Sequence, residues 1–397
     1  MKNWEVKKLG DVCSFFNGQA HEKCIDENGK YKLINSKFVS SEGENFKRTN
    51  SALSPLFVND IVMVMSDVPN GKTLAKCFIV DKDDTYTLNQ RICVIRSKNF
   101  DTRFLYYQLN RNKYLLSFDN GENQSNLRKD DILNCELFVP PLAEQKRIVA
   151  TLDEAFAALG KAKANAEQNL KNSKEIFESY LNGVFENKGK DWEEKTLGEV
   201  TNVQRGSSPR PKGDPKYFSQ TETEYNWITI SDISSYCENN VLLQTREWLT
   251  EVGSKQSRYV DKNEFIIAVS GSTTGKCCIT GIKGFIYDGL AVVKIINNTI
   301  EPKFLLNYMI SLYTTINNSK TGAAFPNINT NYLNNLPFPF PPLKEQKIIV
   351  QKLDALSTET KRLEAIYQTK INDLEELKKS VLQKAFSGEL KTAKALL

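Results

Sequence analysis

The sequence has few of the side chains from which catalytic and metal centres are usually built. Its 397 residues include one histidine, His21, and eight cysteines. The polar segment NGQAHEKC around His21 offers no partner base, so neither a Ser-His-Asp nor a Cys-His centre is expected. No two cysteines form a CxxC pair, which disfavours a structural zinc site and a disulfide framework. Such cysteine usage predicts a protein of the reducing cytoplasm.

Membrane and nucleotide-binding signals are missing as well. No apolar run is long enough to span a bilayer, and the N-terminal MKNWEVKKLG lacks the apolar region of a signal peptide. The segment SGSTTGKC at 270–277 resembles a phosphate-binding P-loop. It has three residues between its glycines where that motif has four, and Cys277 follows the lysine where Ser or Thr is required. Nucleotide binding is therefore not expected. The chain also has no Asn-Pro-Pro-aromatic motif, so a methyltransferase site of that kind is not expected either.

What the chain does contain is an internal repeat. PPLAEQKRIVATLD at 140–153 and PPLKEQKIIVQKLD at 341–354 agree at ten of fourteen positions and lie 201 residues apart. The likeness extends to three further pairs of segments: 4–12 with 192–200, 60–72 with 264–276, and 121–141 with 322–342. The offset varies between 188 and 204 within each half, so the halves share a scaffold and differ by insertions in their loops.

Each half predicts a mixed α/β globule followed by a long helix, which makes the fold class α+β. Short β-branched runs such as IVMVM, EFIIAV and AVVKII are bounded by turn signals and indicate buried strands. The proline-free segments that follow carry apolar residues every three to four positions, as a long helix does. The predicted domains are 1–139 (first globule), 140–186 (central helix), 187–340 (second globule) and 341–397 (C-terminal helix).

The two helices are expected to pair lengthwise as an antiparallel coiled coil. In the second helix, Leu353, Leu374 and Val381 share one heptad position, which Thr360 interrupts. About 40 residues at 1.5 Å each make a rod of about 60 Å, whose apolar stripe needs a partner. Because each rod starts where its own globule ends, antiparallel pairing related by a pseudo-two-fold axis is the natural arrangement.

The repeated PPLxEQK motif marks the start of each helix. Its prolines end the preceding strand and pre-set the first helical turn, and its glutamate suits the helix N-terminus. The glutamine and the lysine of the motif also recur, and two explanations for this stay open. One is shared ancestry of the two halves, and the other is a surface that binds the same partner twice. The second explanation predicts partner contacts by Glu144, Gln145, Lys146, Glu345, Gln346 and Lys347.

Two variable globules, each followed by PPLxEQK and a long helix, resemble the specificity subunit of type I restriction–modification enzymes over essentially the whole chain. The resemblance implies that each globule is a target recognition domain and that the coiled coil spaces the two. It implies double-stranded DNA, two methyltransferase (modification) subunits and two restriction (translocase/nuclease) subunits as partners. It also implies that those subunits use S-adenosylmethionine, ATP and Mg²⁺, while this non-catalytic chain binds no cofactor.

Two similar but unequal DNA-binding globules predict an asymmetric, bipartite DNA target, whose two specific blocks are separated by a spacer of unspecified sequence. Guanine is read by Arg and Lys, adenine by Asn and Gln, and either more loosely by Ser and Thr. In loops that the repeat marks as equivalent, the candidates in the first globule are Asn17, Gln19, Asn70, Lys72, Asn89, Gln90, Arg91, Gln124, Asn126 and Arg128. In the second they are Arg205, Ser207, Ser208, Arg210, Lys212, Ser272, Thr273, Lys276, Asn327 and Asn329.

Each candidate has a structural alternative. The basic loop QRGSSPRPKG at 204–213 could be a solvated turn, and asparagines such as Asn126 and Asn327 could cap helices or turns. For the whole chain, the alternatives are the DNA-recognition subunit of a two-subunit type II restriction–modification system and a coiled-coil scaffold without DNA contact.

Overall fold

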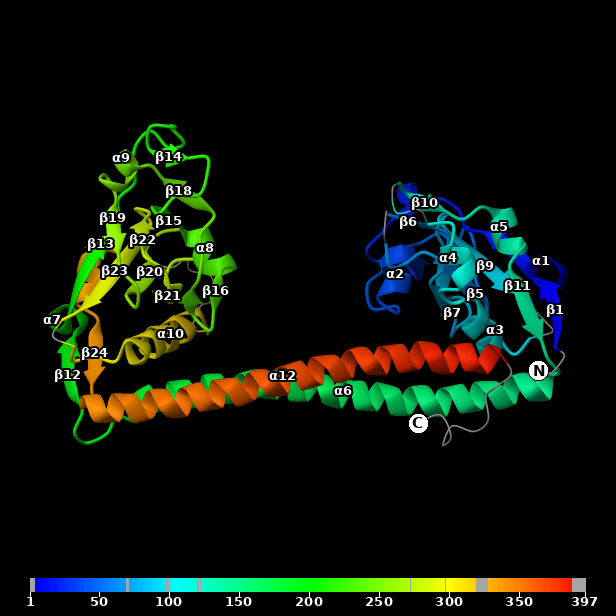
Figure 1. Ribbon diagram of the computed structural model, residues 1–397. Coiled ribbons are helices and arrows are strands. Elements are labelled where there is room, and N and C mark those ends of the chain that lie inside the picture. Colours follow the sequence, from blue (N-terminus) through cyan, green and yellow to red (C-terminus); the bar gives the residue numbers. More distant parts are fainter. Residues whose placement is uncertain are drawn as a thin grey trace. The chain divides into compact units, whose positions relative to one another are not determined.

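The computed structural model describes residues 4–68, 71–97, 100–119, 121, 123–271, 273–296, 298–318 and 328–387. The chain forms two compact units, and each contains one globule and one end of both long helices. Unit 1 comprises Met1–Ala166 and Thr369–Leu397, and unit 2 comprises Glu167–Gln368. Figure 1 labels the elements of each unit.

Unit 1 is built around a four-stranded antiparallel sheet with a smaller sheet beside it. The order in the first sheet is β2 (Ser14–Asn17), β9 (Ile92–Arg96), β5 (Ile61–Val64) and β7 (Cys77–Ile79). In the second, β3 (Tyr31–Ile34) lies between β4 (Lys47–Thr49) and a parallel neighbour, β8 (Tyr86–Leu88). All four residues of β5 are buried, alternating between two core clusters. The continuous apolar run thus reflects a strand covered on both faces.

Short elements complete unit 1. A two-stranded ladder of β1 (Glu5–Lys8) and β11 (Glu136–Val139) precedes α6. The pair β6 (Ser66–Asp67) and β10 (Ser125–Asn126) lies beyond the end of β5. The helices are α1 (Leu9–Val12), α2 (Ser36–Ser40), α3 (Thr102–Leu109), α4 (Lys113–Leu116) and α5 (Lys129–Leu133), with a 3-10 turn at Glu22–Cys24.

Unit 2 repeats this plan with additions. Its main sheet has the order β13 (Thr201–Arg205), β23 (Leu290–Ile295), β20 (Phe265–Ala268) and β21 (Cys277–Thr280), extended by β17 (Val241–Leu242) and β16 (Cys237–Glu238). The second sheet is β14 (Phe218–Ser219), β18 (Glu247–Leu249), β15 (Asn226–Ile228), β22 (Gly284–Ile286) and β19 (Arg258–Val260). β15 and β22 run parallel, as β3 and β8 do. The predicted shared scaffold with loop insertions is confirmed.

The ladder that precedes the second long helix also has a counterpart in unit 1. The ladder of β12 (Glu193–Thr196) and β24 (Pro337–Phe340) matches that of β1 and β11. The helices are α7 (Leu197–Val200), α8 (Ile230–Ser235), α9 (Glu251–Ser254), α10 (Pro302–Asn318) and α11 (Thr330–Asn334).

Two long helices, α6 (Leu142–Glu186, 45 residues) and α12 (Leu343–Phe386, 44 residues), follow the two globules. In unit 1, Ile148 and Leu152 of α6 share a core cluster with Val381 and Ala385 of α12, and Lys163 pairs with Glu375 at 2.7 Å. Residue numbers rise on one helix as they fall on the other, so these ends pack antiparallel, as predicted. In unit 2, Leu181 and Phe185 share a core cluster with Val350 and Leu353.

Thr360, which interrupts the apolar heptad position of α12, is buried all the same. Its hydroxyl donates a hydrogen bond to the Leu356 carbonyl oxygen at 3.0 Å, one turn earlier in the same helix. Ser173 of α6 does the same with the Asn169 carbonyl oxygen at 2.8 Å. Each buried hydroxyl thus finds its partner on its own helix and is tolerated in the seam.

The glutamine of each PPLxEQK motif fastens the long helix to its globule. Gln145 Oε1 accepts from the Asp101 amide at 2.8 Å, and its Nε2 donates to the Pro140 carbonyl oxygen at 2.9 Å. Gln346 Oε1 accepts from the Glu301 amide at 2.8 Å, and its Nε2 donates to the Pro341 carbonyl oxygen at 2.9 Å. Asp101 caps α3, and Glu301 directly precedes α10. Each glutamine therefore joins two helix starts within its unit.

This arrangement corrects one prediction. Gln145 is 1% exposed and Gln346 is 0% exposed, so both side chains are enclosed by their own unit. Burial contradicts the expectation that these two glutamines contact a partner protein. Their recurrence has an internal cause, because a buried amide group must find partners for its donor and its acceptor.

We expect the substitution Gln346→Ala to destabilise unit 2. It leaves the Glu301 amide and the Pro341 carbonyl oxygen without a partner inside the protein, at about 1–3 kcal/mol for each unsatisfied group. The midpoint of thermal unfolding should fall by several degrees. Lys347→Ala is the control, because the neighbouring lysine is exposed and its loss should leave the midpoint unchanged. Equal midpoints for the two variants would contradict the structural role of Gln346.

Candidate nucleic-acid interface

Four loop segments of unit 1 meet beyond one end of its main sheet. The Gly18 amide donates to the Ile92 carbonyl oxygen at 3.0 Å, which places 17–19 beside the turn before β9. The Met65 amide donates to the Arg91 carbonyl oxygen at 3.0 Å, and the Leu127 amide donates to the Met65 carbonyl oxygen at 2.8 Å. The segments 17–19, 88–92, 65–67 and 124–128 are therefore successive neighbours, and they carry most of the predicted DNA-binding residues of this half.

Most of the predicted DNA-binding side chains in these segments are exposed. Gln124 Nε2 donates to the Ser66 hydroxyl at 2.7 Å, and Asn126 Nδ2 donates to the Gln124 carbonyl oxygen at 3.2 Å. Asn89 is half-buried and accepts from the Arg91 amide at 3.3 Å. Asn70 lies outside the described residues. The exposed candidates are Asn17, Gln19, Lys72, Gln90, Arg91, Gln124, Asn126 and Arg128.

The loop that carries Lys72 is shaped by Asp67. The Asp67 carboxylate accepts from the backbone amides of Thr73 at 2.7 Å and Leu74 at 3.2 Å. Burial alone would raise the pKa of Asp67, but the hydrogen bonds to it prevail and lower this pKa below its ordinary value. A Cβ atom on Gly71 would lie 2.1 Å from Asp67 Oδ2, so the turn requires glycine there.

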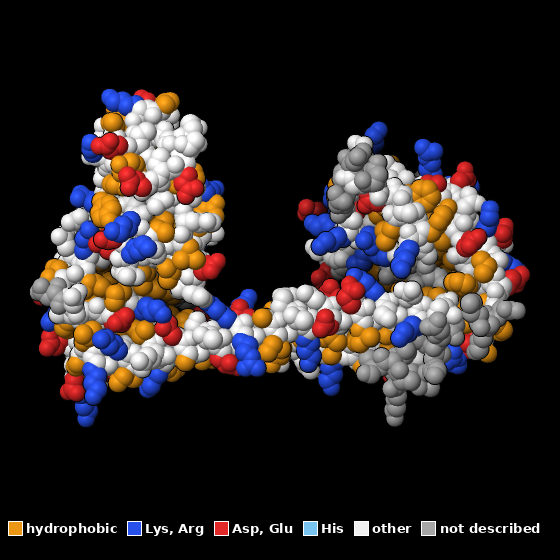
Figure 2. Space-filling view, viewed as in Figure 1, with side chains coloured by type: hydrophobic (Ala, Val, Ile, Leu, Met, Phe, Trp, Pro, Cys, Tyr) orange, Lys and Arg blue, Asp and Glu red, His pale blue; other side chains and the backbone are white. Residues whose placement is uncertain are grey.

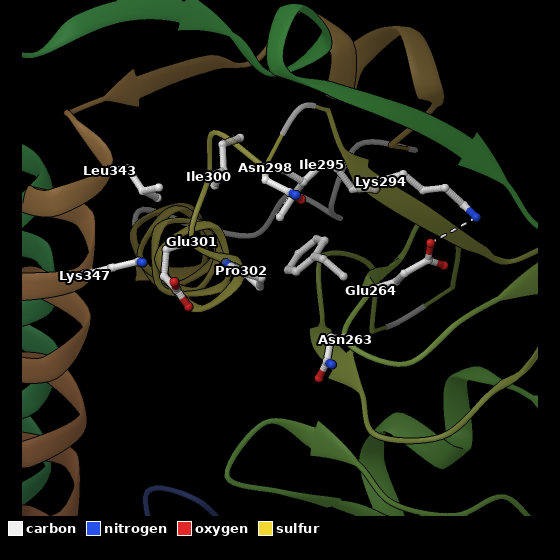
Figure 3. Close-up of a pocket in the computed structure, with 12 residues that line it drawn as sticks. Asn263, Glu264, Lys294, Ile295, Asn298, Ile300, Glu301, Pro302, Leu343 and Lys347 are labelled. Atoms are coloured by element: carbon white, nitrogen blue, oxygen red, sulfur yellow. Dashed lines mark ion pairs between the residues drawn. The ribbon is translucent and has the colours of Figure 1, made fainter.

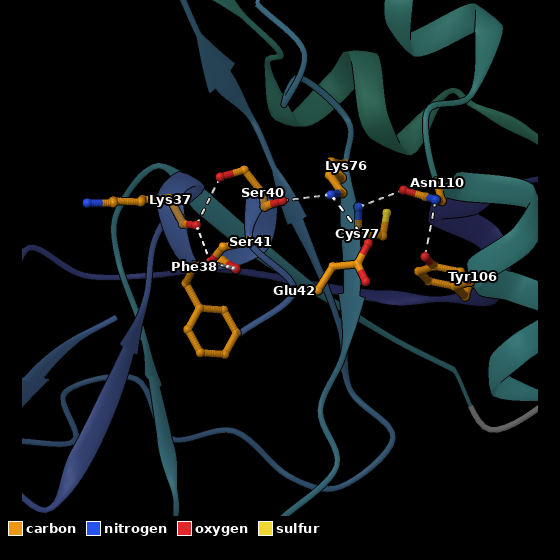
Figure 4. A network of polar contacts seen from close by, with 9 residues as sticks. All are labelled: Lys37, Phe38, Ser40, Ser41, Glu42, Lys76, Cys77, Tyr106 and Asn110. Carbon is orange, nitrogen blue, oxygen red and sulfur yellow. Dashed lines mark hydrogen bonds and ion pairs between the residues drawn. The ribbon is translucent and has the colours of Figure 1, made fainter. Parts of the chain in front are cut away.

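The far side of the same loop is anchored by the polar contacts in Figure 4. Lys76 Nζ donates to the Ser40 carbonyl oxygen at 3.0 Å, which ties the loop to α2. The Cys77 amide donates to Asn110 Oδ1 at 3.0 Å, and Asn110 Nδ2 donates to the Tyr106 hydroxyl at 3.2 Å. Lys72 thus lies on a loop whose base is held by α2 and by the end of α3.

Unit 2 forms the equivalent arrangement. The Gly206 amide donates to the Leu290 carbonyl oxygen at 2.8 Å, and the Val269 amide donates to the Gly289 carbonyl oxygen at 2.8 Å. A Cβ on Gly206 would lie 2.1 Å from the Tyr287 carbonyl oxygen, and a Cβ on Gly18 would lie 2.1 Å from that of Asn89. In both units a glycine lets the loop after β2 or β13 pack directly on the turn before β9 or β23.

The basic loop 204–213 is anchored to that turn. Arg205 Nε donates to the Asp288 carbonyl oxygen at 2.7 Å, and Arg210 Nη2 donates to the Asp288 carboxylate at 2.8 Å. Ser208 Oγ accepts from the Asp288 amide at 3.2 Å, and Ser207 Oγ donates to the Gln256 carbonyl oxygen at 3.1 Å. These contacts hold the loop on the turn, while Arg210, Lys212 and Gly213 at its tip stay exposed.

The loop also borders a cavity of about 340 Å³. Arg210, Lys212 and Glu247 provide charged groups there, and Trp227 and Tyr287 provide aromatic ones. Arg205, Arg210 and Lys212 are exposed. The surface at this end of unit 2 therefore combines cations with hydrogen-bonding groups.

The other candidates of unit 2 have mixed surroundings. Lys276 Nζ donates to the Ser234 hydroxyl at 3.1 Å, and Thr273 is half-buried in the same turn. Gly275 has a φ of 92°, in the left-handed region where glycine is favoured. Asn329 accepts from the Tyr332 amide at 2.7 Å and caps α11, which favours the structural alternative for this residue. Ser272 and Asn327 lie outside the described residues.

One element of the site was missed by sequence reasoning. The turn of Tyr287, Asp288 and Gly289 between β22 and β23 occupies the place of Asn89, Gln90 and Arg91 between β8 and β9. Aligning the two strand pairs of the repeat would have found it. Its composition differs so much from that of the first turn that no residue type drew attention to it.

The start of α12 borders a second cavity, of about 490 Å³, shown in Figure 3. Leu343 and Lys347 line it from α12, and Glu301 and Pro302 line it from the start of α10. The predicted partner-contact residues differ in exposure here. Lys347 is exposed, while Glu345 is half-buried and accepts from the Trp192 indole Nε1 at 2.7 Å.

In unit 1, Lys146 is exposed and Glu144 is half-buried, with its carboxylate 2.8 Å from Arg147 Nε. The leucines that follow the prolines, Leu142 and Leu343, are 50% and 38% exposed. The solvent-facing part of each motif comprises its second proline, its leucine, its variable residue and its lysine.

His21 is a structural residue. It is 0% exposed, its Nδ1 lies 2.7 Å from the Gln19 carbonyl oxygen, and its Nε2 lies 3.0 Å from the Thr87 hydroxyl. Among the residues that the structure describes, no group of three or more His, Cys, Asp or Glu could hold a metal ion. No helix within the described ranges is long and apolar enough to cross a membrane. All eight cysteines are free.

Figure 2 shows lysine and arginine side chains interspersed with acidic and apolar ones on the displayed face of each unit. This agrees with the modest formal net charge of +5. Any polyanion would thus be bound by local groups of cations and hydrogen-bonding side chains.

The chain is similar to known proteins along nearly its whole length. It is 23% identical to the type I restriction enzyme MjaVIII specificity subunit of Methanocaldococcus jannaschii over 420 residues, covering 98% of this chain and 93% of that protein. It is 24% identical to the type I restriction enzyme EcoDI specificity subunit of Escherichia coli over 428 residues, covering 98% of this chain and 89% of that protein.

Two solved structures share its fold. The HsdS subunit from Thermoanaerobacter tengcongensis has a TM-score of 0.63 at 19% identity, covering 98% of each chain. A chain from work on the complex assembly and conformational transition of the type I R-M system has a TM-score of 0.79 at 21% identity. That match covers 98% of this chain and 99% of the other.

The model of the type I restriction modification DNA specificity domain matches residues 1–168 and again 189–376. Each match contains one globule, one PPLxEQK motif and most of the long helix that follows. The chain belongs to the family of type I restriction–modification DNA specificity proteins, with one specificity domain in each half.

Proposed function

We propose that this chain is the sequence-specific DNA-binding subunit of a type I restriction–modification enzyme and that it recognises an asymmetric bipartite target. The observation that carries the proposal is the convergence of equivalent polar loops at the same end of the main sheet in both units. Loops held by backbone hydrogen bonds can present donors and acceptors to base edges in a fixed geometry.

The polar loops of unit 1 and those of unit 2 differ in their side chains, which supports an asymmetric target. Five of the eight exposed candidates in unit 1 are amides, with Gln19, Gln90 and Asn126 among them. In unit 2 the loop on the equivalent turn presents Arg205 and Arg210. Because Asn and Gln pair best with adenine and Arg pairs best with guanine, the two halves of the target should differ in sequence.

We further propose that the chain is not itself an enzyme. The buried His21 has no role in this scheme, and the residues described offer no cluster of metal ligands. S-adenosylmethionine, ATP and Mg²⁺ are then used by the methyltransferase and restriction subunits to which this chain brings DNA. We place the function in the cytoplasm, where the eight free cysteines stay reduced.

The partners in this proposal are two methyltransferase subunits and two restriction subunits. The support is that each unit exposes a leucine and a lysine at the start of its long helix, Leu142 and Lys146 in one, Leu343 and Lys347 in the other. A surface that occurs twice suits two copies of the same partner. The glutamine between them is buried within its own unit and is left out of the proposed contact.

The alternatives gain no support. A scaffold without DNA contact leaves the twofold convergence of anchored polar loops unexplained. The subunit of a two-subunit type II system shares the recognition mechanism and differs in its partners, and the relatives described above are named as type I specificity subunits.

We expect the triple substitution of Arg205, Arg210 and Lys212 by Ala to weaken DNA binding and to reduce its dependence on salt. The slope of log K against log salt should fall by about 0.9 for each phosphate that the variant no longer neutralises. Binding measured from low to moderate salt checks this. The control removes the same charge elsewhere in unit 2, from Lys262, Lys283 and Arg362, which are also exposed. Equal affinities and slopes for the two variants would contradict a DNA contact by loop 204–213.

Exchange of residues 1–139 for the corresponding segment of another specificity subunit should change one half of the methylated target and leave the other half and the spacer unchanged. The reason is that the loops of unit 1 reside in this segment, whereas α6 and α12 follow the globules. Mapping of methylated sites in cells that express the exchanged chain with its partner subunits checks this. An unchanged target would favour the scaffold alternative.

A further inference from the structure

Asp288 organises the basic loop of unit 2 through three separate groups. Its carbonyl oxygen accepts from Arg205 Nε at 2.7 Å, and its carboxylate accepts from Arg210 Nη2 at 2.8 Å. Its amide donates to Ser208 Oγ at 3.2 Å. A single turn residue thus holds both arginines of the loop, although they lie 83 and 78 residues away in sequence.

The turn itself is firmly placed. A Cβ on Gly206 would lie 2.1 Å from the Tyr287 carbonyl oxygen, so the loop packs on the turn without a gap. A Cβ on Gly289 would lie 2.2 Å from Tyr287 Cε1 and 2.7 Å from Ser270 Oγ, so the turn also packs closely on the segment after β20. The Gly289 carbonyl oxygen also accepts from the Val269 amide at 2.8 Å. Asp288 therefore acts from a fixed position.

Both guanidinium groups keep donors for another partner. Each arginine has five N–H donors, and the contact with Asp288 uses one of them. The Arg210 side chain is 68% exposed and that of Asp288 is 33% exposed. An arginine held at one nitrogen with its remaining edge in solvent is suited to the two acceptors of guanine, O6 and N7, which arginine reads with two parallel hydrogen bonds.

The presence of an acid at this position needs a reason. A carboxylate in a DNA-facing surface repels phosphates and by itself weakens binding. In unit 1 the equivalent turn has no acid, since it consists of Asn89, Gln90 and Arg91. In unit 2 the carboxylate restrains a flexible arginine, which lowers the entropy lost when that arginine binds a base. The carboxylate does not strengthen binding to DNA in general. It favours the contact of the arginine with the correct base, and this gain in discrimination between sequences explains why an acid is present.

We propose that Asp288 is a positioning residue that orients Arg205 and Arg210 toward guanines in the half of the target bound by unit 2. This inference rests on the proposed function and makes it more specific. It predicts at least one G·C pair in that half, and it assigns the selectivity for that pair to an arginine that an acid keeps in place.

The variant Asp288→Ala tests the carboxylate alone, because alanine keeps the backbone carbonyl that holds Arg205. The full chain is assembled with its methyltransferase subunits. Binding is measured to the target, to unrelated DNA, and to targets in which each G·C pair of one half is replaced. The half bound by unit 2 is the one that stays unchanged when residues 1–139 are exchanged.

We expect Asp288→Ala to lose about tenfold in discrimination against a replaced G·C pair in the half bound by unit 2, with discrimination in the other half unchanged. Affinity for unrelated DNA should stay equal or rise, since a negative charge is removed. In Arg210→Ala, adding Asp288→Ala should cause little further loss, because the carboxylate acts through that arginine. The control Asp191→Ala removes an exposed acid of unit 2 before β12 and should leave discrimination unchanged.

Three results overturn the inference. One is tighter binding of Asp288→Ala to all DNA with unchanged discrimination, which would make Asp288 an ordinary surface acid. Another is a half-site for unit 2 that contains no G·C pair. The third is that Asp288→Ala reduces discrimination as much in a chain that already carries Arg210→Ala as it does in the unaltered chain. If the unaltered complex binds its mapped target no better than unrelated DNA, the proposed function itself fails and the inference fails with it.

Discussion

The structure of each unit depends on one buried glutamine at the start of a long helix. Gln145 and Gln346 each satisfy a carbonyl oxygen of their own PPLxEQK segment and an amide at the start of α3 or α10. These helices pack against the core from which the strands lead to the recognition loops. The two amide side chains thus connect helix and globule in the same way in both units, and the motif is repeated because the junction is repeated.

Much of the fold could be predicted from the sequence because its signals are local or repeated. Apolar runs such as Ile61–Val64 indicated buried strands, and the heptad spacing around Leu353 indicated a paired helix. For Gln145 the sequence left a contact with a partner as one of two open explanations, and the structure buries its side chain within unit 1. Its hydrogen-bond partner Asp101 lies 44 residues earlier, and only the folded chain brings the two together.

The candidate site was predictable as a set of loops and unpredictable in its internal contacts. Matching the halves selected segments such as 17–19 and 204–213, which the structure places beside equivalent turns. Asp288 was missed because only Arg, Lys, Asn, Gln, Ser and Thr were considered as base-reading residues. Its importance arises from pairing with Arg210, 78 residues away, and no local pattern predicts that contact.

The central claim is that the unlike DNA-binding loops of unit 1 and unit 2 together select one asymmetric target. Mapping every methylated position in a genome that expresses this chain with its partner subunits tests it most directly. The account predicts a single motif with two short specified blocks of different sequence, separated by a spacer of fixed length and unspecified sequence. A continuous motif, or a palindrome with two identical blocks, would contradict it.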